Sequence, residues 1–177
     1  MTRHDPLADP GPLIRRVYAY VAYRLGDGPE AEDVTSEVFE RALRYRGSYD
    51  RSRGRPVQWL FGIARRCVDD ARAGRALASP AQGAEPAALE DVGGGVVERV
   101  ALGQAIEALD DRSRDLISLR YGADLTAREI GEILGLTTNA VEVALHRALK
   151  RLRAELTEAD ERPLRAGEPA PGVSPRP

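Results

Sequence analysis

Residues 125–152, LTAREIGEILGLTTNAVEVALHRALKRL, decide the fold of the second half of this chain. Thr126 and Glu129 have the spacing of a capping box, which predicts that a helix begins between them. Gly135 suits the left-handed residue that ends a helix, and the threonines that follow suit the cap of another helix. The stretch therefore predicts a short helix, a tight turn and a longer second helix.

The second helix has two different faces. Its apolar residues recur at spacings of four, three and four, so Val141, Leu145, Ala148 and Leu152 line one face. The opposite face is polar and partly basic and carries Asn139, Glu142, Val143, His146, Lys150 and Arg153. This arrangement is typical of a helix-turn-helix whose second helix enters a DNA major groove. The alternative is an αα-hairpin whose basic residues only face solvent.

Composition excludes several classes of protein. A chain of 177 residues forms one or two small domains. Apolar runs are too short to span a bilayer, and the N-terminus lacks a signal core, so we expect a cytoplasmic protein. The single cysteine, Cys67, excludes an internal disulfide, and two distant histidines suggest no metal site. We expect no cofactor and no bound metal.

Charge is unevenly distributed although the net charge is only −2. Residues 11–76 contain thirteen arginines against nine acidic residues, and residues 138–153 contain four basic residues against one glutamate. Residues 77–100 contain one arginine against four acids. Two basic segments joined by an acidic connector suit two contacts with nucleic acid.

The first half of the chain is expected to form three helices. Apolar periodicity predicts helices over 13–25, 29–46 and 57–75. Asp27, with Glu30 in the reciprocal position, is predicted to cap the second of these helices. No segment shows the alternation of a β-strand, so the sequence indicates an all-α protein.

An arginine-rich loop, residues 47–56, separates the second and third helices, and Trp59 follows it closely. Exposed rings stack on unpaired bases while guanidinium groups hold phosphates, so this segment is suited to single-stranded DNA. The alternative is that Trp59 is a core residue, as lone tryptophans usually are. Cys67 is expected to be a small buried apolar residue.

Composition also predicts the domain organisation. An Ala-, Gly- and Pro-rich segment reads as a linker between two small helical domains, and the last residues are Pro-rich. The second domain is expected to contain helices over 97–109 and from 110 or 111 to 121, which pack under the helix-turn-helix. The expected divisions are a flexible N-terminus at 1–12, a first domain at 13–76, a flexible linker at 77–96, a second domain at 97–156 and a disordered tail at 157–177.

Three segments together resemble the extracytoplasmic-function group of bacterial sigma factors, of the sigma-70 family, which keep only regions two and four. EAEDVTSEVFERAL (residues 30–43) resembles the region-two helix that docks on the clamp of the polymerase β′ subunit. WLFGIARRCVDDAR (59–72) resembles the segment that opens the −10 promoter element. Residues 108–153 resemble region four, which reads the −35 element. The three segments occur in the family's order and spacing.

The resemblance implies roles for individual residues. Core polymerase binding is implied for Asp33, Glu37, Glu40 and Arg41, whereas the neighbouring Phe39 is expected to be core. Contacts with the −10 element, including a pocket for a flipped base and strand opening, are implied for Ser48, Tyr49, Asp50, Trp59, Arg65, Arg66, Asp69 and Arg72. Contacts with the −35 element are implied for Thr137, Thr138, Asn139, Ala140, Glu142, Val143, His146, Arg147 and Lys150.

The implied partners are core RNA polymerase, through its β′ clamp and β flap, promoter DNA in duplex and single-stranded form, and an anti-sigma factor. No catalytic residue is implied. The chain departs from the family at Arg66, where asparagine is common, and at Glu142, Ala144 and Leu149, where basic residues are common. Fewer cations on the recognition helix imply fewer phosphate contacts and a weaker salt dependence.

Two other functions remain to be weighed. A conventional transcription regulator would share the helix-turn-helix, but its first domain would usually show strands and a ligand pocket. An enzyme would need a nucleophile and base, a phosphate-binding glycine loop or a metal set, and the sequence offers none of these.

Overall fold

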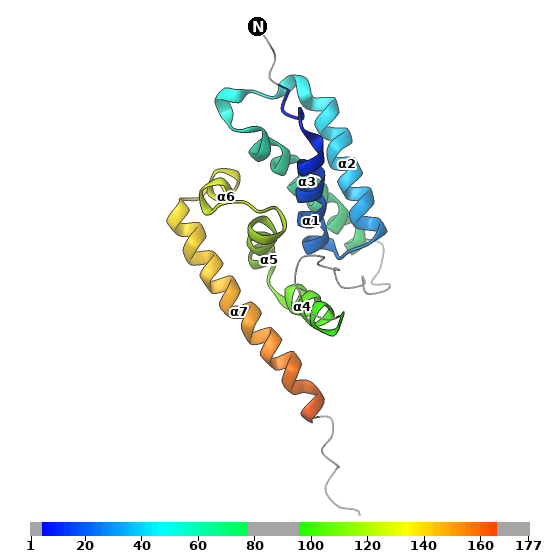
Figure 1. Cartoon of the computed structure of the whole chain (residues 1–177), viewed down its shortest axis with the longest axis vertical. Helices are drawn as coiled ribbons and strands as arrows, with labels where there is room; N and C mark the ends of the chain where they lie inside the picture. The colour runs from blue at the N-terminus through cyan, green and yellow to red at the C-terminus, as the bar shows by residue number, and fades with distance from the viewer. Residues whose placement is uncertain (1–4, 78–95, 166–177) are drawn as a thin grey trace, which may run out of the picture.

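The computed structural model describes residues 5–77 and 96–165, and within these residues the fold is all-α, as the sequence indicates (Figure 1). Three α-helices and two short 3-10 turns make up the first part. Four α-helices make up the second part, with a π-helical turn after the second of them. The first part contains α1 (Pro10–Leu25), α2 (Pro29–Tyr45), η1 (Arg46–Ser48), η2 (Arg51–Arg53) and α3 (Pro56–Leu77). The second contains α4 (Val96–Ala108), α5 (Asp111–Ile117), η3 (Ser118–Gly122), α6 (Ala127–Leu134) and α7 (Thr138–Arg165).

Helices α1, α2 and α3 pack around a common apolar core. Tyr20 of α1 meets Phe61 of α3 edge to face, with ring centroids 5.6 Å apart, and both side chains are buried. Cys67 is fully buried, and burial raises the pKa of its thiol to about 11. The expectation that Cys67 is a buried apolar residue is therefore confirmed.

The predicted cap of α2 is wrong. Gly28, with φ of 122°, occupies the N-cap position and makes no side-chain cap. Asp27 instead accepts a hydrogen bond from the Tyr18 hydroxyl, and that bond raises the pKa of Tyr18 to about 12. The hydroxyl of Tyr18, in the preceding helix, thus binds the Asp27 carboxylate that the local spacing predicted to cap α2.

Several boundaries also differ from the prediction. Helix α1 begins at Pro10 instead of residue 13, because proline is well suited to the first turn of a helix. Its Ile14 lies on the same face as Val17 and Val21 by helical spacing, yet it is 46% exposed because it lies near the helix start. Helix α7 continues to Arg165, so the disordered tail predicted from residue 157 is wrong for 157–165. The linker at 78–95 and the tail at 166–177 lie outside the described residues.

The helix-turn-helix follows the predicted local signals closely. Thr126 and Glu129 form the reciprocal capping box, and Gly135 ends α6 in the left-handed region with φ of 68°. The four residues predicted for the inner face of α7, namely Val141, Leu145, Ala148 and Leu152, are all buried. Asp110 caps α5 by accepting a hydrogen bond from the Ser113 backbone N–H.

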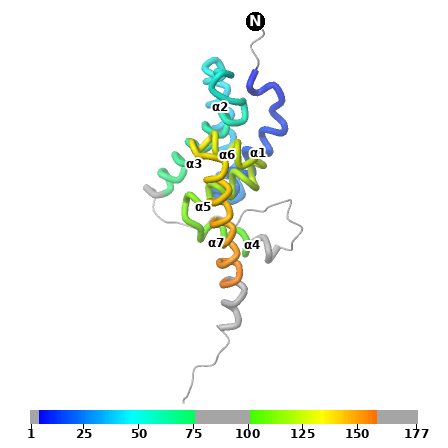
Figure 2. The backbone as a smooth tube through the Cα atoms, turned by 90° about the vertical axis from the view of Figure 1, so that its left-hand side faces the viewer, coloured from blue at the N-terminus to red at the C-terminus, as the bar shows by residue number. Residues whose placement is uncertain are grey.

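The two halves of the chain share one apolar core, which the sequence did not predict. Helices α5 and α6 lie against α1 and α3, whereas most of α7 extends away from them (Figures 1 and 2). Leu116, Leu119 and Leu125 from the second half are buried in the same cluster as Val17 and Tyr20. The chain therefore adopts a closed arrangement of its two halves.

Candidate nucleic-acid and polymerase interfaces

The start of α7 is held in place by a tight turn. Leu136 donates a backbone hydrogen bond of 2.8 Å to the Gly131 carbonyl, so the turn folds back onto α6. A Cβ on Gly131 would lie 2.6 Å from the Leu136 carbonyl oxygen, which explains the glycine. Thr137 then accepts a hydrogen bond from the Ala140 backbone N–H and caps α7. These contacts fix the direction in which α7 leaves the turn.

The outer face of α7 is free to meet a partner. Val143 is 43% exposed, although it is apolar, and is therefore available to contact a thymine methyl group. Arg147 and Lys150 supply positive charge beyond the single Glu142. The residues predicted to read duplex DNA are all exposed: Thr137, Thr138, Asn139, Ala140, Glu142, Val143, His146, Arg147 and Lys150.

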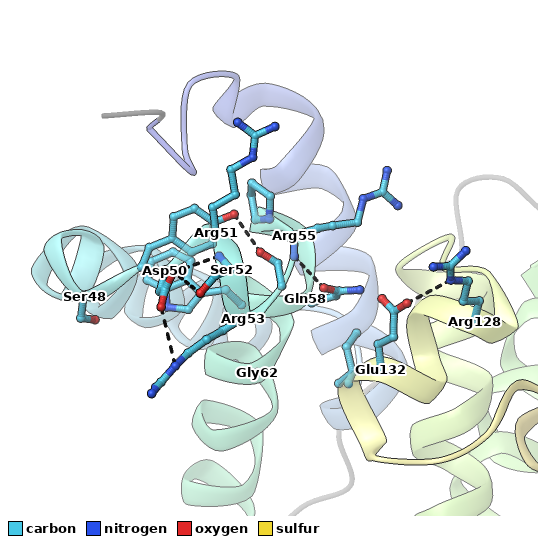
Figure 3. A pocket seen from close by; sticks show the side chains of 15 residues that line it. Ser48, Asp50, Arg51, Ser52, Arg53, Arg55, Gln58, Gly62, Arg128 and Glu132 are labelled. Carbon is cyan, nitrogen blue, oxygen red and sulfur yellow. Dashed lines mark hydrogen bonds and ion pairs between the residues drawn. The ribbon is translucent and has the colours of Figure 1, made fainter. Parts of the chain in front are cut away.

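A second surface lies on the loop between α2 and α3, beside an open hollow of about 1060 Å³ (Figure 3). Tyr49 and Trp59 face each other with ring centroids 5.6 Å apart and planes tilted by 60°. The Tyr49 hydroxyl donates a 3.0 Å hydrogen bond to the Gly54 carbonyl. The Tyr49 side chain is therefore fixed both by its ring contact with Trp59 and by this hydrogen bond. Trp59 is only partly buried and packs against the core at one side, so it combines a core contact with a surface contact.

Asp50 shapes the same loop. Its carboxylate accepts hydrogen bonds of 2.7 Å from the Ser52 hydroxyl and 2.9 Å from the Ser52 backbone N–H (Figure 3). These two bonds hold the pKa of Asp50 below its usual value. The loop and the first turn of α3 thus bring Ser48, Tyr49, Asp50 and Trp59 to one hollow, which several arginines also line.

The hollow also has a wall that the sequence did not predict. Arg128, Glu132 and Ile133 of α6 line its far side, opposite the loop (Figure 3). Arg55 of the loop lies 3.1 Å from the Glu129 carboxylate. No local sequence signal links residues 74 positions apart, so this wall could be found only from the three-dimensional structure.

The α3 residues predicted to open the DNA strands lie in two different surroundings. Arg66 and Asp69 are exposed, as a contact surface requires. Arg65 and Arg72 instead point toward α5: Nε of Arg65 lies 3.0 Å from the Asp115 carboxylate, and Arg72 pairs with Asp111. Arg65 and Arg72 thus share one face of α3, and that face contacts the second half of the chain.

The outer face of α2 carries the residues predicted for polymerase binding. Asp33 and Glu40 are exposed, and Arg41 pairs with Glu37 and, at 2.8 Å, with Asp70 of α3. These hydrogen bonds to two carboxylates raise the pKa of Arg41 and keep it charged. Phe39 is half-buried and packs against the core, as expected.

Two large side chains near the end of α2 were missed by the sequence reasoning. Leu43 is 58% exposed and Tyr45 is 52% exposed. Helical spacing from the buried Val38 and Ala42 could have placed them outside the core stripe.

The described residues contain no group of three or more His, Cys, Asp or Glu side chains positioned to hold a metal ion. None of the helices within the described ranges combines the length and apolar character needed to cross a membrane.

Comparison with protein families identifies both halves of the chain. A family profile described as Sigma-70 region 2 matches residues 12–76, and one described as Sigma-70, region 4 matches residues 105–154. The chain is 35% identical over 160 residues to the ECF RNA polymerase sigma factor SigD of Mycobacterium tuberculosis, covering 82% of this chain and 74% of SigD. It is also 35% identical over 165 residues to the ECF RNA polymerase sigma factor ShbA of Streptomyces griseus, covering 85% of each chain.

Two solved structures have a similar fold. One is CnrH in complex with the cytosolic domain of CnrY, with a TM-score of 0.58 and 26% identity over 81% of this chain and 82% of that chain. The other is the sigma factor RpoE in complex with the anti-sigma factor NepR from Bartonella quintana. Its TM-score is 0.66 over 82% of this chain and 92% of that chain, and at 19% identity it supports the fold alone.

Proposed function

Because the chain belongs to the extracytoplasmic-function group of RNA polymerase sigma factors, we propose that it binds core RNA polymerase and directs it to a set of promoters. The detailed proposal is supported by two separate surfaces on one chain whose side chains suit nucleic acid. One is a helix face suited to duplex DNA, and the other is an aromatic and arginine-rich loop suited to single strands. A regulator that only binds duplex DNA would need the first surface alone.

The −35 element is read by α7 in this proposal. Asn139, Glu142 and His146 offer hydrogen-bonding groups to base edges, and Glu142 is able to accept from a cytosine amine. Arg147 and Lys150 contact phosphates, which fix the orientation of the helix in the groove. Since few cations face the DNA, few phosphates are contacted and the salt dependence of binding is shallow.

The −10 element is opened and held by the loop and by α3. Flipping a base out of the duplex costs a few kcal/mol of unstacking. Stacking on Trp59 and Tyr49 offsets part of that cost, since each base–aromatic contact contributes about 1–3 kcal/mol. Ser48 and Asp50 offer hydrogen bonds to the flipped base, while Arg65, Arg66, Asp69 and Arg72 line the path of the strand.

Core polymerase is bound through the outer face of α2, where Asp33, Glu37, Glu40 and Arg41 meet the β′ clamp. The exposed apolar Leu43 and Tyr45 at the end of the same helix support this assignment. The second half of the chain meets the β flap. The sigma factor selects the promoter in the cytoplasm, and the polymerase performs the chemistry, so the chain itself contributes no catalytic residue and no cofactor.

An anti-sigma factor controls the chain in this proposal. Support comes from the similar structure of CnrH, which was solved in complex with a second protein, the cytosolic domain of CnrY. Such a partner would hold the chain inactive until a signal releases it.

The test of the function is run-off transcription by core polymerase and the full chain on fragments of genomic DNA. We expect new transcripts whose start sites share a −35 and a −10 sequence. The variant Glu142→Ala is expected to change which −35 sequences are used, whereas Glu158→Ala, an exposed carboxylate further along α7, is its matched control. The proposal is refuted if adding the chain yields no transcripts beyond those that core polymerase makes alone.

A further inference from the structure

Another hollow lies between the end of α2 and the middle of α3, and we call it the arginine groove. Its volume is about 410 Å³, and it is lined by Arg41, Arg44 and Tyr45 of α2 and by Ile63 and Arg66 of α3. Three of these five side chains are arginines and none is a carboxylate. The groove therefore presents positive charge around a single aromatic ring.

The arginines of the groove differ in what neutralises them. Arg41 is held by two carboxylates, those of Glu37 and, at 2.8 Å, of Asp70. Arg44 and Arg66 are exposed, and neither forms an ion pair with another residue in the part of the chain that the structure describes. Two guanidinium groups at the groove thus keep their donors available for an anionic partner.

Tyr45 offers an aromatic face to the same partner. It is 52% exposed, and its ring contacts no other aromatic ring within the described ranges, whereas Tyr49 packs on Trp59. Tyr45 lies about 200° around α2 from Leu43, so its side chain borders α3 and the groove. An exposed ring with a free face is a platform on which an unpaired base stacks.

The arginine groove is continuous with the loop surface that is proposed to hold the −10 element. The Ser48 hydroxyl donates a 2.7 Å hydrogen bond to the Tyr45 carbonyl, so the loop is tied to the end of α2. On α3, Gly62 lines the hollow beside the loop (Figure 3), and Arg66, one turn further on, lines the groove. A Cβ on Gly62 would meet nothing within 4 Å, so the surface between the two hollows is open at this residue. A strand that leaves the loop over Gly62 reaches the groove after about 5.4 Å, the length of one helical turn.

Single-stranded DNA fits the groove better than an acidic segment of another protein does. Proteins that bind single strands combine cations that follow the phosphates with aromatic rings that stack on the bases. The groove has both features, since the Tyr45 ring lies beside two unpaired arginines. An acidic peptide would use the arginines but would leave the ring without a planar partner.

We propose that the arginine groove binds the opened strand next to the flipped base, with one base stacked on Tyr45 and phosphates held by Arg44 and Arg66. The proposal rests on the proposed function, which places the strand on the loop and on α3, and extends the strand's path to the end of α2. Arg41 takes no phosphate, because its two carboxylates already hold it. Its bond to Asp70 instead fixes α2 against α3 and so maintains the shape of the groove.

The test measures the binding of a short, labelled DNA single strand of mixed sequence to the full chain by fluorescence anisotropy. A mixed sequence is suitable because stacking on an aromatic ring tolerates every base. The titration is repeated at several salt concentrations, since the slope of log affinity against log salt reports the number of phosphates contacted. Co-elution of each variant with core polymerase is measured beside it.

Two pairs of variants separate the ring from the charge. Tyr45→Leu removes the aromatic face and keeps an apolar side chain, whereas Tyr45→Phe keeps the face and is its matched control. Arg44→Gln removes one cation of the groove. Its control is Arg15→Gln on α1, because Arg15 is also exposed and forms no ion pair with another described residue. All three positions are exposed, so we expect each variant to keep its fold.

We expect Tyr45→Leu to bind the strand about 5- to 150-fold more weakly, the range that one stacked base spans, and Tyr45→Phe to bind as the wild type does. Arg44→Gln should lower the salt slope by about 0.7, the value for one phosphate of a single strand, while Arg15→Gln leaves the slope unchanged. Equal affinities of the two Tyr45 variants overturn the inference, and so does an unchanged slope in Arg44→Gln.

The polymerase measurement separates this inference from its alternatives. Variants of Tyr45 and Arg44 that bind the strand normally but no longer co-elute with core polymerase would make the groove a protein-binding surface and overturn the inference. A wild-type chain that binds no single strand also overturns it, because the groove is open in this structure. A wild-type chain that binds the strand through Tyr45 and Arg44, yet fails to join core polymerase, refutes the proposed function and leaves the groove's DNA contact established.

Discussion

The substitution Gly131→Ala tests the helix-turn-helix at its closest contact. The added Cβ would lie 2.6 Å from the Leu136 carbonyl oxygen, where ordinary van der Waals contacts are 3.4–4 Å. The oxygen belongs to backbone, and the Leu136 N–H is itself bonded to the Gly131 carbonyl, so it has little freedom to move away. Overpacking of this kind costs about 1–3 kcal/mol.

The matched control is Gly74→Ala on α3, where an added Cβ meets nothing within 4 Å. Both substitutions gain about 1 kcal/mol of helix propensity, so this contribution cancels in the comparison. The difference between the two variants is then the overpacking cost of about 1–3 kcal/mol. At about 2–4 °C per kcal/mol for a chain of this size, Gly131→Ala should melt about 2–12 °C below Gly74→Ala.

Thermal unfolding followed by circular dichroism measures this difference, and binding to a −35 duplex measures its effect on α7. We expect weaker duplex binding by Gly131→Ala and unchanged binding by the control. Equal melting temperatures for the two variants would refute the reasoning, because the turn would then have room for a methyl group.

Three further predictions concern single side chains and the DNA-opening step. Tyr20→Phe leaves the buried Asp115 carboxylate without one of its donors, so denaturant titration should find a loss of about 1–3 kcal/mol, and no loss would refute the contact. The hydrogen bonds from Ser113, its backbone N–H first, hold the pKa of Asp110 below its usual value of 3.8. This stabilisation is present above the usual pKa and is lost as the pH falls through the lower folded value, so a pH series of unfolding should find a shallower acid loss in Asp110→Asn than in the wild type. Replacing both Arg65 and Arg72 by Ala should impair promoter opening, measured by reactivity of unpaired thymines, more than core binding; equal losses would count against the assignment.

Local signals in the sequence predicted the helix-turn-helix well. The capping box of Thr126 and Glu129, the left-handed Gly135 and the cap at Asp110 depend on residues at most four positions from the groups that they cap. Such contacts form whenever the helix forms, so the spacing alone is informative. Asp27 and Glu30 have the same spacing as a capping box, but the Asp27 carboxylate accepts a hydrogen bond from the Tyr18 hydroxyl of the preceding helix instead.

The contact between the two halves of the chain could not be predicted in the same way. Arg65 and Arg72 are seven residues apart and so lie on one face of α3, but their partners lie 50 and 39 residues further along the chain. Neither charge nor periodicity selects Asp115 and Asp111 from the other acidic residues. Only the packing of η3 on α1, which Gly122 permits, brings these aspartates to the arginines.

Binding to core RNA polymerase tests the central claim most directly. The full chain and purified core polymerase are mixed and separated by size, with the charge-reversed pair Asp33→Lys and Glu40→Lys on α2 beside Glu107→Lys as the control. We predict that the wild type and the control elute with the polymerase, and that the α2 variant elutes alone while keeping its helical spectrum. A wild-type chain that fails to elute with the polymerase, yet still binds duplex DNA, would contradict the account.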